Sequence, residues 1–143
     1  MSKNISTFIF LSSVMFSQQD QIFVGTRPLG MGGAFIAVAD DANTITWNPA
    51  GLPALRRTEF TTTYADLYTL GITQSYIGFV RPFSDRLALG FDWSSIGYDD
   101  SELAYSENKL NFAFGFQPHK IFSFGLTLKY LMRDMLLDEA SYG

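Results

Sequence analysis

Three segments in the second half of the chain alternate strictly between large apolar residues and smaller or polar ones. These segments are Arg86–Ser94, Lys109–Gln117 and Ser123–Arg133. Successive side chains of an extended strand point to opposite faces, so a sustained period of two predicts strands with one apolar face. The sequence therefore predicts an all-β fold built from antiparallel strands.

The two faces of these strands differ in an unusual way. The large apolar residues share one face: Leu87, Leu89, Phe91, Trp93, Leu110, Phe112, Phe114, Phe116, Phe124, Leu126, Leu128, Tyr130 and Met132. The opposite face is mostly small and neutral, with Asp92, Lys129 and Arg133 among its few charged residues. A soluble sandwich or barrel would direct Phe and Leu inward and carry more charge outward. The pattern instead predicts a transmembrane β-barrel with its apolar face toward lipid and these charges in the lumen.

Two earlier segments also predict strands. Glu59–Tyr68 and Ile72–Arg81 are rich in Thr, Tyr, Ile, Phe and Val, although their alternation is weaker. The chain then supplies about five strands of about 9–11 residues, a length that crosses a bilayer at a steep tilt. Bacterial single-chain barrels have an even number of strands, about eight at the least. We therefore expect residues 57–143 to be the first strands of an incomplete barrel, continued in a longer chain.

The connections between the predicted strands alternate in length. Pro82–Asp85 and Pro118–Lys120 are expected to form tight turns, whereas Ser95–Ser106 reads as a longer polar loop with an acidic cluster at Asp99, Asp100 and Glu102. Outer-membrane barrels have short periplasmic turns and longer extracellular loops. This order predicts that both proline turns lie on the periplasmic side.

Residues 1–19 have the layout of a secretory signal peptide. Lys3 precedes a mostly apolar stretch at Ile5–Phe16, and Gln18–Asp20 is polar again. The apolar stretch is too short for a permanent membrane helix. We expect export, with cleavage after Ser17 as one possibility, and localisation in the outer membrane of a Gram-negative cell.

Residues 20–56 form a segment of different composition, rich in Gly, Ala and Asp. Pro49 and Pro53 oppose a continuous helix or a central strand, and the glycines allow close backbone contacts. We expect compact, irregular structure with one short helix around Ala34–Ala42. Asp41 and Asn48 are expected to cap turns by accepting hydrogen bonds from nearby backbone N–H groups.

Two motifs in this segment resemble a known family. The stretch Gly25–Asn43 contains Arg-Pro-Leu-Gly-Met-Gly-Gly-Ala-Phe, and Trp47–Leu52 reads Trp-Asn-Pro-Ala-Gly-Leu. At this spacing they resemble the N-terminal signature of the FadL-like outer-membrane proteins, and most closely the PorV/PorQ-type branch. The resemblance implies an N-terminal plug, or hatch, lodged in the barrel lumen. Its expected motif residues are Gly30, Gly32, Gly33, Asp41, Trp47, Asn48, Pro49, Ala50 and Gly51.

The resemblance leaves two functions open. FadL-like proteins pass hydrophobic small molecules such as long-chain fatty acids across the outer membrane, whereas the PorV/PorQ type acts as a protein-interaction component of type IX secretion. The implied partners are outer-membrane lipid and either hydrophobic small molecules or secretion-system proteins. Transport by a FadL-like barrel is the function we expect.

Composition argues against several other classes of protein. A mean hydropathy of +0.08 with 16% aromatic residues fits barrel strands, in which only alternate residues must be apolar. A net charge of −4 without a basic run argues against nucleic acid. The chain has no cysteine and a single histidine, His119, without a nucleophile partner. Asp40, Asp41 and Asn43 lack the spacing of a calcium loop, so capping is the preferred reading. We expect no enzymatic activity, no cofactor and no metal.

Overall fold

The computed structural model describes residues 24–67, 69–99 and 103–137. Short helical elements come first: α2 (Thr26–Gly30), α3 (Phe35–Val38), α4 (Thr44–Trp47) and the 3-10 helix η1 (Pro49–Ala54). Five strands follow: β1 (Glu59–Leu67), β2 (Ile72–Ser84), β3 (Leu87–Asp99), β4 (Leu103–His119) and β5 (Phe122–Leu137). The predicted number of strands is confirmed, and the predicted signal peptide at 1–19 lies outside the described residues.

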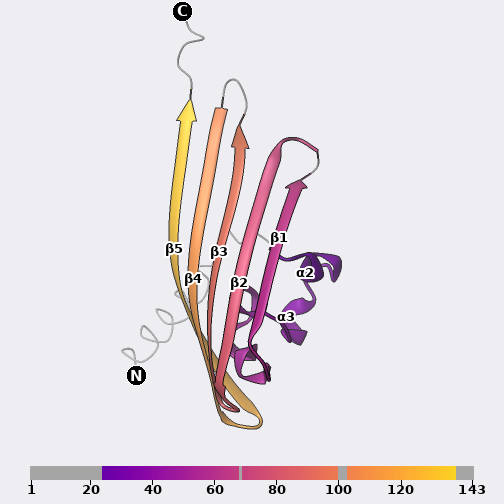
Figure 1. The fold of residues 1–143 in the computed structure, drawn as a ribbon, viewed down its shortest axis with the longest axis vertical. Coiled ribbons are helices and arrows are strands. Elements are labelled where there is room, and N and C mark those ends of the chain that lie inside the picture. The colour runs from indigo at the N-terminus through magenta and orange to yellow at the C-terminus, as the bar shows by residue number, and fades with distance from the viewer. Residues whose placement is uncertain (1–23, 68, 100–102, 138–143) are drawn as a thin grey trace, which may run out of the picture.

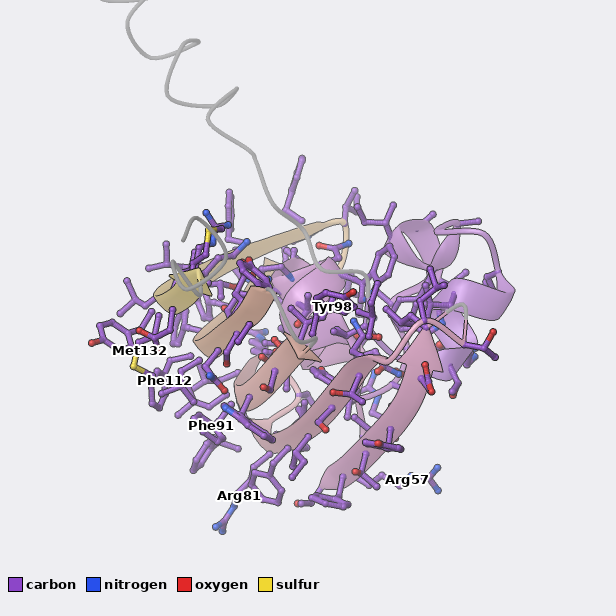
Figure 2. All side chains as sticks on the ribbon, turned by 90° about the horizontal axis from the view of Figure 1, so that it is seen from above. Arg57, Arg81, Phe91, Tyr98, Phe112 and Met132 are labelled. Atoms are coloured by element: carbon purple, nitrogen blue, oxygen red, sulfur yellow. The ribbon has the colours of Figure 1, made fainter. Side chains whose placement is uncertain are left out.

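The strands form one antiparallel sheet in the order β1-β2-β3-β4-β5, with each strand paired to its neighbour in sequence. The described residues form an open sheet rather than a closed barrel, with β1 and β5 at its edges. The sheet curves, and the helical elements lie on its concave side (Figures 1 and 2). We call this side the inner face, the opposite side the outer face, and residues 24–55 the N-terminal segment.

The alternation predicted from the sequence separates these two faces. On the outer face, Phe79, Phe91, Phe112 and Leu128 form one row across four strands and are between 38% and 67% exposed. On the inner face, Ala88, Asp92, Asn111 and Ala113 are no more than 3% exposed. The large apolar side chains are therefore the exposed ones, and the small and polar side chains are the buried ones.

The position of the predicted proline turns was wrong. β2 continues through Pro82 to Ser84, and β4 continues through Pro118 to His119, so the turns begin two or three residues later than expected. The pairing register shifts between Pro82 and Ser84 and again between Phe116 and His119. Proline lacks a backbone N–H, and a bulge or strand end is where a sheet tolerates this.

The prediction of a long polar loop at Ser95–Ser106 was also wrong. Ser95–Asp99 continues β3 and Leu103–Ser106 begins β4, with Ser95 opposite Asn108 and Gly97 opposite Ser106. The predicted acidic cluster falls on residues of which the structure describes only the Asp99 backbone. The later strands are consequently longer than predicted: β4 has 17 residues and β5 has 16, whereas β1 has 9, within the predicted length.

The N-terminal segment is built from short turns, as its composition predicts. The helix expected around Ala34–Ala42 is shorter than expected, since α3 spans four residues and ends where Ala39 adopts a left-handed conformation with φ of 40°. Gly32 and Gly33 have φ of 60° and 83°, a region that favours glycine, and their turn separates α2 from α3. Among the described residues, no helix is long and apolar enough to cross a membrane.

Candidate functional site

The N-terminal segment packs on the inner face through an apolar cluster. The segment contributes Ala42, Ile45, Leu52 and Leu55, and the sheet contributes Val80, Ala88 and Ala113, all of them at most 4% exposed. These sheet residues come from β2, β3 and β4. Burial of apolar side chains from both sides stabilises the seating of the segment against the strands.

Glycines of the sheet bring the backbone of the segment unusually close. A Cβ atom at Gly115 would lie 2.7 Å from the Pro49 carbonyl oxygen, and one at Gly125 would overlap the Ala50 nitrogen and the Pro49 carbonyl carbon. A Cβ at Gly90 would lie 2.6 Å from Cγ1 of Ile45. Real Cβ atoms do not approach so closely, so these positions require glycine for the observed packing.

The Asn-Pro-Ala-Gly motif forms the part of the segment that lies deepest against β4 and β5. Pro49 starts η1, as the fixed φ of proline allows at the first position of a helix. Ala50 lies against Gly125, and Gly51 faces Ala39, whose carbonyl oxygen would be 2.8 Å from an added Cβ. The motif therefore contacts β5 through Ala50 and the rest of the N-terminal segment through Gly51.

Trp47 organises a second apolar cluster inside the segment, with Phe35 and Ala39. The Trp47 and Phe35 rings meet edge to face with centroids 6.3 Å apart, and the indole N–H donates to the Val24 carbonyl oxygen over 3.0 Å. A Cβ atom added at Gly33 would lie 3.7 Å from Cζ3 of the Trp47 ring, so the turn at Gly33 lies next to this ring. Edge-to-face packing and a satisfied indole N–H both stabilise this arrangement.

Asp41 confirms its predicted capping role. Its Oδ1 accepts hydrogen bonds from the backbone N–H and the side-chain amide of Asn43, both at 2.8 Å. Its other oxygen binds Arg27 at 2.8 Å, and Arg27 also binds Asp40 at 2.6 Å. The Arg27 guanidinium holds the pKa of Asp40 below its ordinary value. Arg27 therefore forms ion pairs with both neighbouring carboxylates, Asp40 and Asp41.

The predicted capping role of Asn48 was wrong. Its side-chain amide donates to the carbonyl oxygen of Ile36 over 3.0 Å, and it makes no cap to the 3-10 helix that follows. The amide thereby ties the end of α4 back to α3. A Cβ atom added at Gly30 or Gly32 would meet no atom within 4 Å, so neither position requires glycine for close packing.

A polar link joins the segment to β3 and β4, and the sequence did not single it out. Thr46 donates to Oδ2 of Asp92 over 2.7 Å, and Asn111 donates to Oδ1 of the same carboxylate over 2.7 Å. Asp92 is completely buried. The prediction that Asp92 lies on the face opposite the aromatic residues is confirmed, although no sequence signal pairs it with Thr46, which is 46 residues away.

Beyond this link the inner face becomes strongly polar toward the β3–β4 connection. Glu107 is 3% exposed and accepts hydrogen bonds from Arg133 over 2.6 Å and from the Tyr105 hydroxyl over 2.8 Å. Lys109 lies one inward position further along β4 and is 6% exposed. Charged side chains thus line the same concave surface that the N-terminal segment covers in its other half.

The contacts of the site are mainly those between the N-terminal segment and the sheet. Within the described ranges, no group of three or more His, Cys, Asp or Glu side chains could hold a metal ion. His119 is exposed, and its Nδ1 accepts a long hydrogen bond of 3.4 Å from the Ile121 backbone N–H.

Comparison with known proteins adds no relative. No protein-family model matches the chain, and neither a curated protein nor a solved structure is significantly similar to it.

Proposed function

We propose that this chain forms the first strands of an outer-membrane β-barrel of the FadL-like type, which passes hydrophobic small molecules such as long-chain fatty acids. In this proposal the N-terminal segment is the plug of the lumen, and the inner face is the lumenal wall. The supporting observation is the reversed distribution of side chains, in which large apolar residues are exposed and small or polar residues are buried against the segment.

The outer face argues for lipid as its solvent. Phe112, Phe124, Leu126, Leu128 and Tyr130 are between 56% and 67% exposed, and they belong to adjoining rows of the sheet. Soluble proteins rarely expose a continuous apolar surface of this kind, because contact with water is unfavourable. Rows lie about 7 Å apart along a strand. Several adjoining rows therefore approach the apolar band, roughly 25 Å tall, that barrels present to lipid.

The outer face is also bounded as a membrane surface should be. Beyond the apolar rows, the outward positions of β2, β3 and β4 become Ser75, Ser95 and Asn108, and then Thr73, Gly97 and Ser106. The strands continue in pairing through these polar rows. On β1 and β5 the first of these rows holds Tyr64 and Met132. The change from apolar to polar along the three central strands fits strands that extend out of the hydrocarbon region.

The N-terminal segment has the properties of a plug for an apolar solute. Its contact with the strands is an apolar cluster together with glycine contacts and the Thr46–Asp92–Asn111 link. The hydrogen bonds of the segment within itself, such as that of Trp47 with Val24, hold it together apart from the wall. In this proposal, the solute passes when the segment moves away from the wall.

Uptake of a fatty acid tests this function. A strain that produces the protein at the natural length of its gene is expected to take up labelled oleate several-fold faster than a deletion strain. A labelled hydrophilic sugar serves as the control and should enter both strains at the same rate. Equal oleate uptake with and without a correctly inserted protein would contradict the transport function.

A further inference from the structure

We infer that the outer face carries a phospholipid site, with an acyl chain in the groove between β2, β3 and β4 and the lipid phosphate bound by Arg81. This inference rests on the proposed function, because it needs the outer face to contact a membrane. It goes further by naming one position on that face and the lipid chemistry that fits it.

The groove for the acyl chain lies between large apolar side chains, and the strand backbone is exposed at its base. It encloses about 290 Å³, and its walls are Phe79, Leu89, Phe91 and Phe112. The backbone of Gly90 and Ala113 forms its floor, since the Ala113 side chain is buried on the inner face and Gly90 has none. An unbranched hydrocarbon chain suits such a narrow apolar groove.

The aromatic walls of the groove contact one another across neighbouring strands. The rings of Phe91 and Phe112 contact each other with centroids 5.0 Å apart, and both residues are held in register opposite one another. Phe79 lies opposite Phe91 on the other neighbouring strand. Figure 2 shows Phe91 and Phe112 on the side of the sheet away from the helical elements.

Arg81 supplies the complementary charge at one end of the groove. Its guanidinium stacks 5.4 Å from the centroid of the Phe83 ring, and it points away from the sheet on the same side as Phe91 (Figure 2). In the described part of the chain, Arg81 has no ion-pair partner. An arginine fork can bind a phosphate through two parallel hydrogen bonds, and its stem can remain in apolar surroundings.

A second hollow lies at the end of the sheet where the β2–β3 and β4–β5 turns are. It encloses about 460 Å³ and is lined by Arg56, Arg86, His119 and Lys120, with Asp85 as its one acidic residue. Asp85 is paired with Arg56 at 3.1 Å. An anionic headgroup whose acyl chain lies in the groove would meet the Arg81 guanidinium, which lines the groove beside Phe83. A neutral apolar ligand would leave Arg81 without an anion, so a phospholipid is the occupant that the groove and the charge favour together.

Lipid binding by purified protein tests this site. The protein, produced at its natural length and extracted from outer membranes, would be stripped of lipid in mild detergent and titrated with dioleoylphosphatidylglycerol. Native mass spectrometry would count the bound lipid. We expect Arg81→Gln to weaken binding about tenfold, as the loss of a charge-assisted pair implies. Arg57→Gln is the matched control and should bind as the unchanged protein does, because Arg57 pairs with Glu59 at 3.3 Å outside the groove.

Two further ligands distinguish binding of the whole phospholipid from binding of its acyl chains alone or of phosphate alone. Dioleoylglycerol, which lacks the phosphate, should bind about as weakly to the unchanged protein as phosphatidylglycerol binds to Arg81→Gln. Excess inorganic phosphate should fail to displace the phospholipid. Equal binding of both lipids, displacement by phosphate, or undiminished binding by a membrane-inserted Arg81→Gln protein would each overturn the site. These results would leave the barrel intact, whereas a protein that never enters the outer membrane would defeat the barrel itself.

Discussion

Replacing Phe112 with Arg is expected to destabilise the protein in the outer membrane by roughly 1–4 kcal/mol, because the cost of Arg on the lipid face of a barrel rises from the interface toward the bilayer midplane. Phe112 is 56% exposed on the outer face and lies in the row shared with Phe79, Phe91 and Leu128. The guanidinium would have to leave water for hydrocarbon, and no carboxylate in the described residues of this row can pair with it. Urea titration of the protein folded in lipid vesicles measures the loss.

Two control variants separate the effect of the added charge from the effect of its position on the outer face. Phe112→Leu keeps the surface apolar and should cost much less, because it loses chiefly the ring contact with Phe91. Asn108→Arg adds the same charge on the same strand and face, between Ser95 and Met132 at the edge of the apolar rows, and it should cost much less. If Phe112→Arg were as stable as Asn108→Arg, the outer face would be in water and the membrane assignment would fail.

Replacing Gly125 with Ala is expected to unseat the N-terminal segment from the sheet. The added methyl would overlap backbone atoms of Pro49 and Ala50 and lie 2.8 Å from Cγ of Pro49. Backbone atoms on both sides cannot give way as a flexible side chain can, and overpacking of this kind costs about 1–3 kcal/mol or more. Amide hydrogen exchange over residues 42–55 should accelerate, since protection there depends on packing against the strands.

The same variant has a functional consequence if the segment is a plug. Cells that carry Gly125→Ala should admit a small hydrophilic dye faster than cells with the unchanged protein. Gly97→Ala is the matched control, because a Cβ there meets its nearest atoms at ordinary distances of 3.7 and 3.8 Å. Unchanged exchange and unchanged dye entry in Gly125→Ala would show that the contact between the segment and β5 does not close a path.

The sequence predicts the two faces of β3, β4 and β5 because the alternation reports a difference in environment along each strand. It predicts β2 less well for a physical reason. Tyr76 and Val80 are buried on the inner face, where the N-terminal segment covers them, while Ile77 and Phe79 are exposed on the outer face. Both faces of β2 are therefore apolar, and the period of two is obscured.

The missed strand ends have a different cause. Toward the β3–β4 connection, inward Ser94 and outward Ser95 are both polar, so pairing continues where alternation stops. Proline misled the turn assignments because Pro82 and Pro118 lie at or next to register shifts rather than in the turns themselves. Local residue types carry no information about either pairing.

The sequence predicted which residues of the N-terminal segment form the motif. It did not predict which residues of the sheet they contact. Asp41 caps a turn two residues away, which sequence spacing reveals. The partners of the motif on the sheet, Gly115 and Gly125, lie more than 60 residues further along the chain and look like ordinary small inward positions. Asp92 was expected on that face, but its hydrogen bond with Thr46 depends on how the segment is seated.

The most direct test of the account is the state of the protein in the cell envelope. Outer membranes from cells that produce the protein at its natural length would be isolated and run on a gel with and without boiling. The account predicts a band in the outer-membrane fraction whose mobility changes on boiling, as a closed barrel resists unfolding by detergent. A soluble band with the same mobility in both lanes would contradict the account, and the exposed apolar face would then have to be covered by another protein surface.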